Sequence, residues 1–196
     1  MTHYYSPKQT SPTSETEITI RLKNLEFHLF SGSGVFSKKR LDTGTRVLIE
    51  NCEIPENASI LDLGCGIGVV GISVKMRYPK TKVTQTDVNE RAIMLTKKNL
   101  KKHNLDNKVK VSDGFTRLKD EYDVILFNPP QSAGKKVCFK LIEESYKHLH
   151  PEGSLQLIAR RNKGGNSLSK KMEEVFGNVE VIVKRSGYWL YMSFKS

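Results

Sequence analysis

Apolar and polar positions along this chain follow two spacings, and each spacing predicts a different element. Short apolar runs of strand length are followed by longer segments in which apolar residues recur every three or four positions. A hairpin is predicted over residues 18–32, because alternating residues flank a Lys23-Asn24 turn. Further strands are predicted over residues 58–64, 82–87, 108–113, 122–128, 153–160, 179–185 and 187–194. Helices are predicted over residues 42–52, 68–78, 89–103, 134–149 and 166–176.

The order of these elements indicates a fold class. Five strands alternate with helices, whereas the last two strands have no helix between them. Parallel neighbours need a crossover and antiparallel neighbours do not. We therefore expect a doubly wound, Rossmann-like α/β fold whose seven-stranded, mainly parallel sheet ends in an antiparallel hairpin. Residues 1–50 are expected to form an extension with a loose start, a β-hairpin and a short helix packed on the core, and residues 51–196 the main domain.

The chain carries a large excess of positive charge. Its 196 residues include 32 Lys and Arg against 21 Asp and Glu, a net charge of +11. Any single basic cluster is compatible with a solvated helix face, but their sum is typical of a protein that binds a polyanion such as a nucleic acid. The clusters lie at residues 38–40, 97–98, 101–102, 135–136, 160–161 and 170–171.

Other classes of protein are disfavoured by what the sequence lacks. No segment has the apolar length of a signal peptide or of a membrane span, which needs roughly 20 residues. The cysteines Cys52, Cys65 and Cys138 are widely spaced and form no CxxC pair, which argues against a disulfide framework or a structural zinc site. We expect a soluble, cytoplasmic protein that has no membrane partner and no metal.

A glycine-rich turn follows the predicted strand 58–64. Gly64, Gly66, Gly68 and Gly71 stand where this strand gives way to a helix, so that a ligand can approach the backbone at a helix N-terminus. This arrangement predicts a nucleotide-like ligand. Residues 66–71 also match the GxGxxG pattern of dinucleotide-binding proteins, and a tight turn that binds nothing is a third reading.

Acidic residues at strand ends favour one ligand over the others. Asp62 precedes the glycines, where its charge would repel a pyrophosphate but attract the ammonium and sulfonium groups of S-adenosylmethionine. Asp87 would accept hydrogen bonds from the ribose hydroxyls. Asp113 would accept from the adenine amine with Phe115 near the ring face, although an ordinary turn residue explains Asp113 nearly as well. The predicted cofactor-binding residues of these segments are Asp62, Gly64, Cys65, Gly66, Gly68, Asp87, Val88, Asp113, Gly114 and Phe115.

The strand 122–128 ends in an unusual segment, Asn128-Pro129-Pro130. Proline has no backbone N–H, so this corner presents mainly acceptors, namely an amide oxygen and carbonyl groups. Acceptors can hold the two N–H groups of an exocyclic amine while its lone pair turns toward a methyl donor. We therefore interpret Asn128, Pro129 and Pro130 as catalytic residues, against the alternative that the prolines merely end a strand.

The order of these motifs resembles the class I S-adenosylmethionine-dependent methyltransferases, and Asn-Pro-Pro is similar to the motif of members that methylate an amino nitrogen. "SGSGVFSKKRLDTGTRVLIE" (31–50) and the basic stretch that begins at Arg160 are similar to the small-subunit ribosomal RNA methyltransferase C family. The likeness runs from about residue 4 to residue 188 and is best to short, single-domain archaeal members.

This resemblance implies an activity and several further site residues. It implies that residues 51–196 form a methyltransferase domain that uses S-adenosylmethionine to methylate guanine at N2 in small-subunit ribosomal RNA. Phe36 would cover the cofactor or target pocket, unless it is a core residue beneath the hairpin. Asn128 would also touch the cofactor. The residues expected to contact RNA are Gln131, Lys135, Lys136, Arg160, Arg161 and Lys163.

The residues leave other functions open. Gln131 stands where family members often have an aromatic residue that stacks on the target base. Methylation of adenine N6 or of a protein glutamine therefore remains possible. Two further alternatives are an RNA-binding module that holds the cofactor without turnover and an NAD-dependent oxidoreductase.

Overall fold

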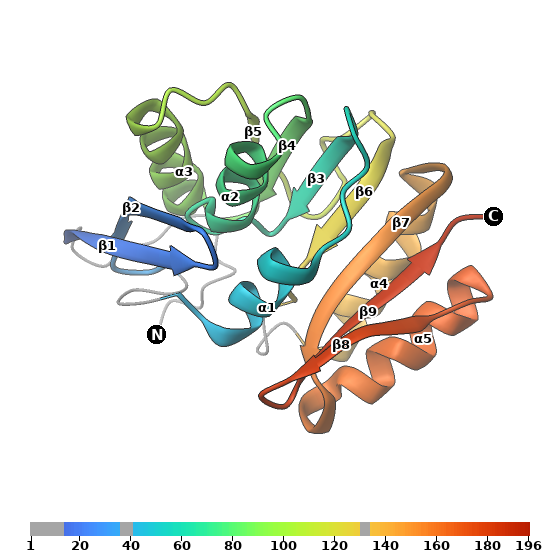
Figure 1. Ribbon diagram of the computed structural model, residues 1–196. Coiled ribbons are helices and arrows are strands. Elements are labelled where there is room, and N and C mark those ends of the chain that lie inside the picture. Colours follow the sequence, from blue (N-terminus) through green and yellow to red (C-terminus); the bar gives the residue numbers. More distant parts are fainter. Residues whose placement is uncertain (1–13, 36–40, 130–133) are drawn as a thin grey trace.

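The computed structural model of the chain describes residues 14–35, 41–129 and 134–196, and its main feature is a seven-stranded sheet (Figure 1). The parallel and antiparallel pairings are those predicted: β3, β4, β5, β6 and β7 are parallel to their neighbours, and β9 is antiparallel to β7 and β8. The strands in spatial order are β5 (Lys108–Val111), β4 (Lys82–Asp87), β3 (Ser59–Leu63), β6 (Tyr122–Phe127), β7 (Leu149–Arg160), β9 (Tyr188–Phe194) and β8 (Glu180–Arg185).

Helices cover both faces of this sheet, which confirms the predicted doubly wound α/β class (Figure 1). One face carries α1 (Thr43–Asn51), α2 (Val69–Arg77) and α3 (Glu90–Lys102), and the other carries α4 (Lys135–Lys147) and α5 (Asn166–Phe176). Each face has its own hydrophobic cluster. Alternate residues of a central strand point to opposite faces, so Ile60 joins the first cluster and Leu61 the second.

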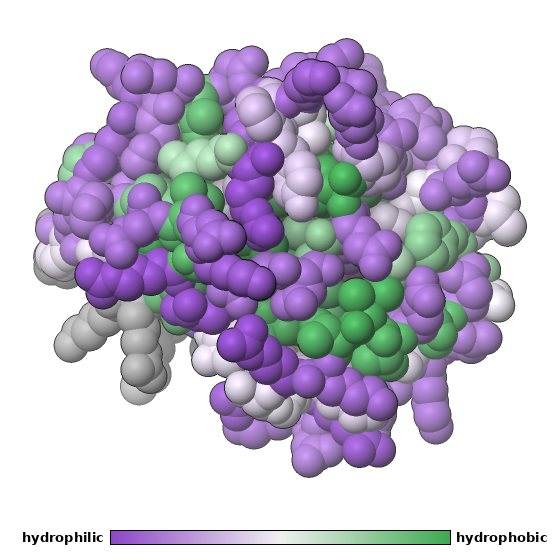
Figure 2. Space-filling view, viewed as in Figure 1, coloured by the Kyte–Doolittle hydropathy of each residue, from purple (hydrophilic) through white to green (hydrophobic). Residues whose placement is uncertain are grey.

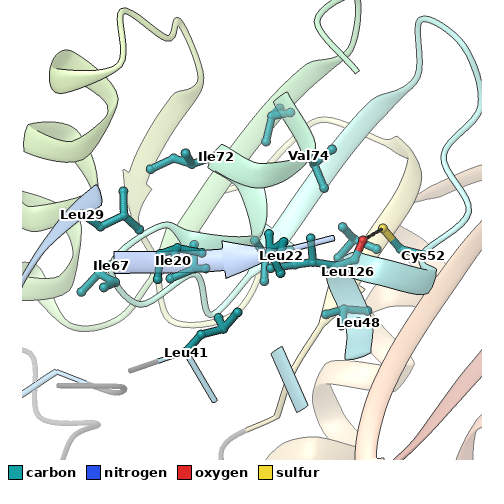
Figure 3. Packing of buried hydrophobic residues seen from close by; sticks show 14 of the residues in the cluster. Ile20, Leu22, Leu29, Leu41, Leu48, Cys52, Ile67, Ile72, Val74 and Leu126 are labelled. Carbon is teal, nitrogen blue, oxygen red and sulfur yellow. Dashed lines mark hydrogen bonds between the residues drawn. The ribbon is translucent and has the colours of Figure 1, made fainter. Parts of the chain in front are cut away.

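The predicted N-terminal hairpin forms from β1 (Glu15–Leu22) and β2 (Leu25–Gly32). Asn24 in the turn has φ 62°, a left-handed conformation that asparagine tolerates. The hairpin buries Ile20 and Leu29 against the cluster that also contains Ile67 and Ile72 (Figure 3). It is therefore joined to the main sheet by a continuous core, and the division of the chain at residue 50 stays a prediction.

The structure differs from the predicted elements at several boundaries, of which the start of β7 is the largest. β7 begins at Leu149, four residues earlier than predicted, because Tyr122 of β6 already pairs with Leu149 before a register shift. The chain after β7 forms an irregular turn at Arg161–Gly165, where Gly164 has φ 102°. A Cβ on Gly165 would lie 2.8 Å from the Arg160 carbonyl oxygen, so this close turn requires glycine.

The face of the molecule shown in Figure 2 is mainly hydrophilic, and a continuous apolar area on it lies over β8 and β9. β8 is an edge strand, and Val181 on it is 38% exposed. No helix among the described residues is long and apolar enough to cross a membrane.

Candidate active site

The predicted site residues gather at the carboxyl ends of the central strands. The chain runs from β3 to β4 and β5 on one side and then returns to β6 on the other, so the strand order reverses between β3 and β6. Open α/β sheets bind ligands at such a reversal. Asp62 of β3, Asp87 of β4 and Asn128 after β6 all stand at this edge.

Asp62 is a buried carboxylate with one oxygen in use. Its Oδ2 accepts hydrogen bonds from the Gly71 backbone N–H and from Gln85 Nε2, each at 2.9 Å. Oδ1 accepts none from the described residues. Burial raises the pKa of Asp62 to about 6, while the two hydrogen bonds act in the opposite direction. A desolvated carboxyl group with a spare oxygen suits a cationic ligand.

Asp87 holds the glycine-rich loop in place. Its Oδ2 accepts from the Gly66 backbone N–H and its Oδ1 from the Asn89 backbone N–H, each at 2.9 Å. The side chain is 3% exposed. A carboxylate is an acceptor-only group of the kind that binds hydroxyl groups, and the role of Asp87 in holding a ribose stays a prediction. Val88 beside it is half-buried.

The glycines of the loop have different roles. Gly64 is exposed at φ 73°, and a Cβ placed there would meet no atom within 4 Å, so the backbone borders open space. At Gly68 and Gly71, a Cβ would lie 2.9 Å from Thr96 Cγ2 and 2.4 Å from Gln85 Cδ. These two glycines therefore serve internal packing, whereas the Gly64 end of the loop borders space that a ligand can enter.

Residues of α3 brace the same loop, and sequence reasoning did not single them out. Thr96 Oγ1 donates to the Gly66 carbonyl at 2.8 Å, and Asn99 Nδ2 donates to the Ile67 carbonyl at 3.0 Å. Asn99 also accepts from the Phe30 N–H and donates to the Phe30 carbonyl. The sequence signal that could have identified Thr96 and Asn99 is the presence of polar residues on the otherwise buried face of a helix.

Cys65 lies within the loop, in surroundings that do not favour a reactive thiolate. Its thiol is buried among Gly66 and Thr96, and burial raises its pKa well above the usual range. The predicted contact of Cys65 with the cofactor stays a prediction. All three cysteines of the chain are free and buried.

The Asn128 side chain is held from one end. Its Nδ2 donates to Thr45 Oγ1 at 2.9 Å and to Asp42 Oδ2 at 3.3 Å. Its Oδ1 accepts no hydrogen bond from the described residues. Asn128 is half-buried and Pro129 is buried. The corner thus presents an acceptor oxygen whose orientation is fixed by the amide nitrogen.

The residues of the predicted adenine site follow β5. Asp113 is exposed at the end of β5, beside Gly114 at φ 54°. Phe115 is 4% exposed, and its ring stacks on His148 with centroids 4.6 Å apart. Apolar packing thus places the Phe115 side chain in the core, and its contact with an adenine ring stays a prediction.

The predicted RNA-contacting cations lie at the same edge of the sheet as Asn128. Lys135 and Lys136 begin α4, and Arg160, Arg161 and Lys163 follow the carboxyl end of β7; all five are exposed. Two aromatic rings lie among them. The Arg160 guanidinium is 5.0 Å from the Tyr188 ring centre, and Arg161 and Lys184 approach Trp189 at 4.6 and 4.4 Å.

Three predicted site residues, Phe36, Pro130 and Gln131, lie outside the described residues. Within the described ranges, no group of three or more His, Cys, Asp or Glu side chains is arranged to hold a metal ion.

Comparison with known proteins identifies relatives over most of the chain. Residues 26–192 match the family model of the methyltransferase small domain. The protein YbxB of Bacillus subtilis, described as uncharacterized, is 38% identical over 98% of both chains. Ribosomal RNA small subunit methyltransferase C of Mannheimia succiniciproducens is 31% identical over 96% of this chain and 58% of its own.

A solved structure shares the fold. The 16S rRNA N2 G1207 methyltransferase of T. thermophilus, in complex with AdoMet and guanosine, superposes with a TM-score of 0.83 at 21% identity, over 94% of this chain and 52% of its own. This chain spans about half the length of the methyltransferase C relatives that it matches. From the family match and the shared fold, the chain belongs to the methyltransferase small domain family of class I S-adenosylmethionine-dependent methyltransferases.

Proposed function

We propose that this protein transfers the methyl group of S-adenosylmethionine to guanine N2 in small-subunit ribosomal RNA. The observation that carries the proposal is the Asn128 corner, where the amide nitrogen is already hydrogen-bonded and the amide oxygen is left to accept. The choice of guanine N2 rests on the likeness to the methyltransferase C relatives, two of which are 31% identical over 96% and 85% of this chain.

The fit of the cofactor rests on three features at the edge of the sheet. The spare oxygen of Asp62 suits the ammonium group, the two oxygens of Asp87 suit the ribose hydroxyls, and the open space at Gly64 suits the approach of the ligand to the backbone. Asp113 and Val88 would border the adenosine. When bound, S-adenosylmethionine supplies an electrophilic methyl carbon on a positively charged sulfur.

The chemistry asks the protein mainly for orientation. An exocyclic amine on a purine is a weak nucleophile because its lone pair is delocalised into the ring. Asn128 Oδ1 and the Pro129 carbonyl would accept its two N–H groups and so turn the lone pair toward the methyl carbon. The nitrogen–carbon bond forms as the sulfur–carbon bond breaks, and the extra proton on nitrogen then passes to water. A general base is not needed before transfer.

RNA binding is proposed for the basic surface around this corner, which comprises Lys135, Lys136, Arg160, Arg161 and Lys163. Among the described residues, none of these cations has a carboxylate within ion-pair distance, so their charge is available to a phosphate backbone. Trp189, which is half-buried beside Arg161, offers apolar surface to a base, whereas Tyr188 beside Arg160 is buried.

One experiment tests the proposed product. The protein is incubated with labelled S-adenosylmethionine and, separately, naked ribosomal RNA, small ribosomal subunits and total protein, and the digests are analysed by mass spectrometry. We expect N2-methylguanosine from RNA or from the subunit, formed about 10²-fold or more slowly with Asn128→Ala. Label on adenine N6 or on a protein glutamine would contradict the substrate claim while leaving the family assignment intact.

Binding to RNA is expected to weaken steeply with salt, because each neutralised phosphate releases counterions. Reversal of Lys135 and Arg161 to Glu should lower the affinity for RNA. It should also reduce the slope of log K against log salt concentration by about one or more, while the affinity for the cofactor stays unchanged. The matched control reverses Lys82 and Lys108, which are exposed at the amino ends of β4 and β5. Filter binding between low and physiological salt measures both slopes. Equal slopes for the two double variants would show that the charge around Asn128 serves only solubility.

Replacement of Asp62 by Asn is expected to stabilise the fold. Because burial raises the pKa of Asp62 from 3.8 to about 6, its carboxyl group contributes stability below pH 4 that is lost as the pH rises through about 6. This difference in pKa corresponds to about 3 kcal/mol at pH 7. An Asn oxygen can accept the same two hydrogen bonds without a buried charge. Denaturant unfolding at pH 4 and pH 7 should show the advantage of the variant growing with pH.

The same Asp62→Asn variant is expected to bind the cofactor at least tenfold more weakly, because the ammonium group loses its anionic partner. Calorimetry with S-adenosylhomocysteine, which keeps the ammonium group, measures this. A variant that gained stability and kept full affinity would place the ammonium group elsewhere.

A further inference from the structure

The segment Asp42-Thr43-Gly44-Thr45 has a role that the proposed reaction leaves unexplained. It forms the start of α1, where Asp42 caps the helix by accepting from the Thr45 backbone N–H at 2.8 Å. The same oxygen, Oδ2, also accepts from the Thr45 hydroxyl at 2.8 Å. A helix cap needs only the first of these bonds.

The second bond determines what Thr45 can do next. Its hydroxyl proton points to Asp42, so Oγ1 faces Asn128 with its lone pairs and can only accept. Asp42 Oδ2, 3.3 Å from the same amide nitrogen, is also an acceptor. Two acceptors on one side leave Asn128 a single favourable amide orientation, with its NH₂ group toward α1 and its oxygen away from it.

Packing holds Asp42 in this position. The Tyr188 hydroxyl donates to Asp42 Oδ1 at 3.3 Å, and Asp42 is half-buried. A Cβ on Gly44 would lie 2.6 Å from Tyr188 Cε1, so the helix can come this close to β9 only with glycine at that position. Asp42, Gly44 and Thr45 therefore belong to one arrangement.

We propose that Asp42 and Thr45 are positioning residues of the methyl transfer, which fix the Asn128 amide so that Oδ1 faces the target amine. This inference rests on the proposed function, because it gives Asn128 Oδ1 the role of acceptor. Without the Thr45 hydroxyl, only Asp42 Oδ2 at 3.3 Å holds the amide nitrogen. The amide then rotates more readily, and its NH₂ group can face the target amine, whose N–H groups it cannot accept. The loss then appears in turnover and not in the binding of either substrate.

The test compares two threonine variants. Thr45→Val removes the hydroxyl but keeps the backbone N–H that Asp42 caps, and Thr45→Ser restores a hydroxyl. We expect Thr45→Val to lower kcat about tenfold or more, with KM for RNA and the affinity for S-adenosylhomocysteine within about twofold of the parent. Thr45→Ser should recover most of the loss. The matched control is Thr81→Val, since Thr81 is a buried threonine whose hydroxyl bonds to the Tyr78 carbonyl at the amino end of β4.

A double-mutant comparison shows whether Thr45 acts through Asn128. In an Asn128→Ala background, Thr45→Val should cause no further loss of kcat, because the group that it positions is gone. An undiminished tenfold loss in that background would overturn the inference. So would a parallel fall in the thermal midpoint and kcat that Thr81→Val reproduces, since this would mark a purely structural effect.

A readout without substrate separates this inference from the proposed function. The side-chain NH₂ resonances of Asn128 in ¹⁵N spectra should be protected from exchange in the parent and in Thr45→Ser, and lose that protection in Thr45→Val. If no RNA were methylated but this pattern appeared, the proposed substrate would fail while the positioning of Asn128 would stand. Unprotected Asn128 resonances in the parent would overturn the positioning role itself.

Discussion

Asn128→Ala is expected to lower the turnover number by about 10² or more while leaving cofactor affinity nearly unchanged. The reason is that Oδ1 accepts from the amine most strongly as positive charge develops on nitrogen during methyl transfer. A partner that is fixed in advance costs no reorganisation in the transition state. Removal of Asn128 takes away this acceptor, but it removes no contact that Asp62 or Asp87 makes with the cofactor.

Single-turnover kinetics with saturating S-adenosylmethionine and RNA measure this effect. Asn178→Ala is the matched control, because Asn178 is also half-buried and donates its amide to backbone carbonyls of Phe176 and Phe194, away from the carboxyl ends of the parallel strands. We expect Asn178→Ala to lower stability but not turnover. If Asn128→Ala raised only KM, the acceptor role of Asn128 in the transition state would be refuted.

Asp87→Ala is expected to weaken cofactor binding at least tenfold. Two charge-assisted hydrogen bonds to the ribose hydroxyls, each worth roughly 1.5 to 3 kcal/mol, would be lost. The variant also releases the Gly66 and Asn89 backbone N–H groups that Asp87 now holds at 2.9 Å. The loop and the ribose would therefore lose the same hydrogen-bond acceptor, the Asp87 carboxylate.

Calorimetry with S-adenosylhomocysteine compares Asp87→Ala with Asp123→Ala. Asp123 also accepts a hydrogen bond from a backbone N–H, but at the opposite end of the sheet. There it accepts from the N–H and the hydroxyl of Ser59, each at 2.7 Å. Its loss should destabilise the fold and spare the cofactor. Tight binding by Asp87→Ala would show that the ribose lies elsewhere.

The sequence was sufficient for the fold and for the location of the site because both depend on local patterns. Strand and helix periodicity placed the elements, and acidic residues at strand ends meet at one edge of any parallel sheet. The contact between Thr45 and Asn128 spans 83 positions, and that between Phe30 and Asn99 spans 69. Such contacts depend on how helices settle on the sheet, which no local pattern specifies.

Phe115 shows a second limit of reasoning from local patterns. An aromatic residue two positions after an acidic strand end fits an adenine site, but hydrophobic packing competes for the same ring. Gly114 lies close to Leu141 of α4, and the Phe115 ring stacks on His148 at the end of that helix. Phe115 is therefore buried. Burial of a phenylalanine side chain contributes about 1.5 to 3 kcal/mol, enough to settle its position without a ligand.

Asn99 has a consequence for how this protein can change in evolution. The Asn99 side chain donates a hydrogen bond to the Ile67 carbonyl of the glycine-rich loop. The same side chain also forms the two hydrogen bonds to Phe30 that hold the N-terminal hairpin against α3. A recombination event that gave the sheet a new N-terminal segment would have to present a backbone N–H and a carbonyl to Asn99 at the same place, or leave its amide unsatisfied. The hairpin and the loop are therefore expected to be inherited together.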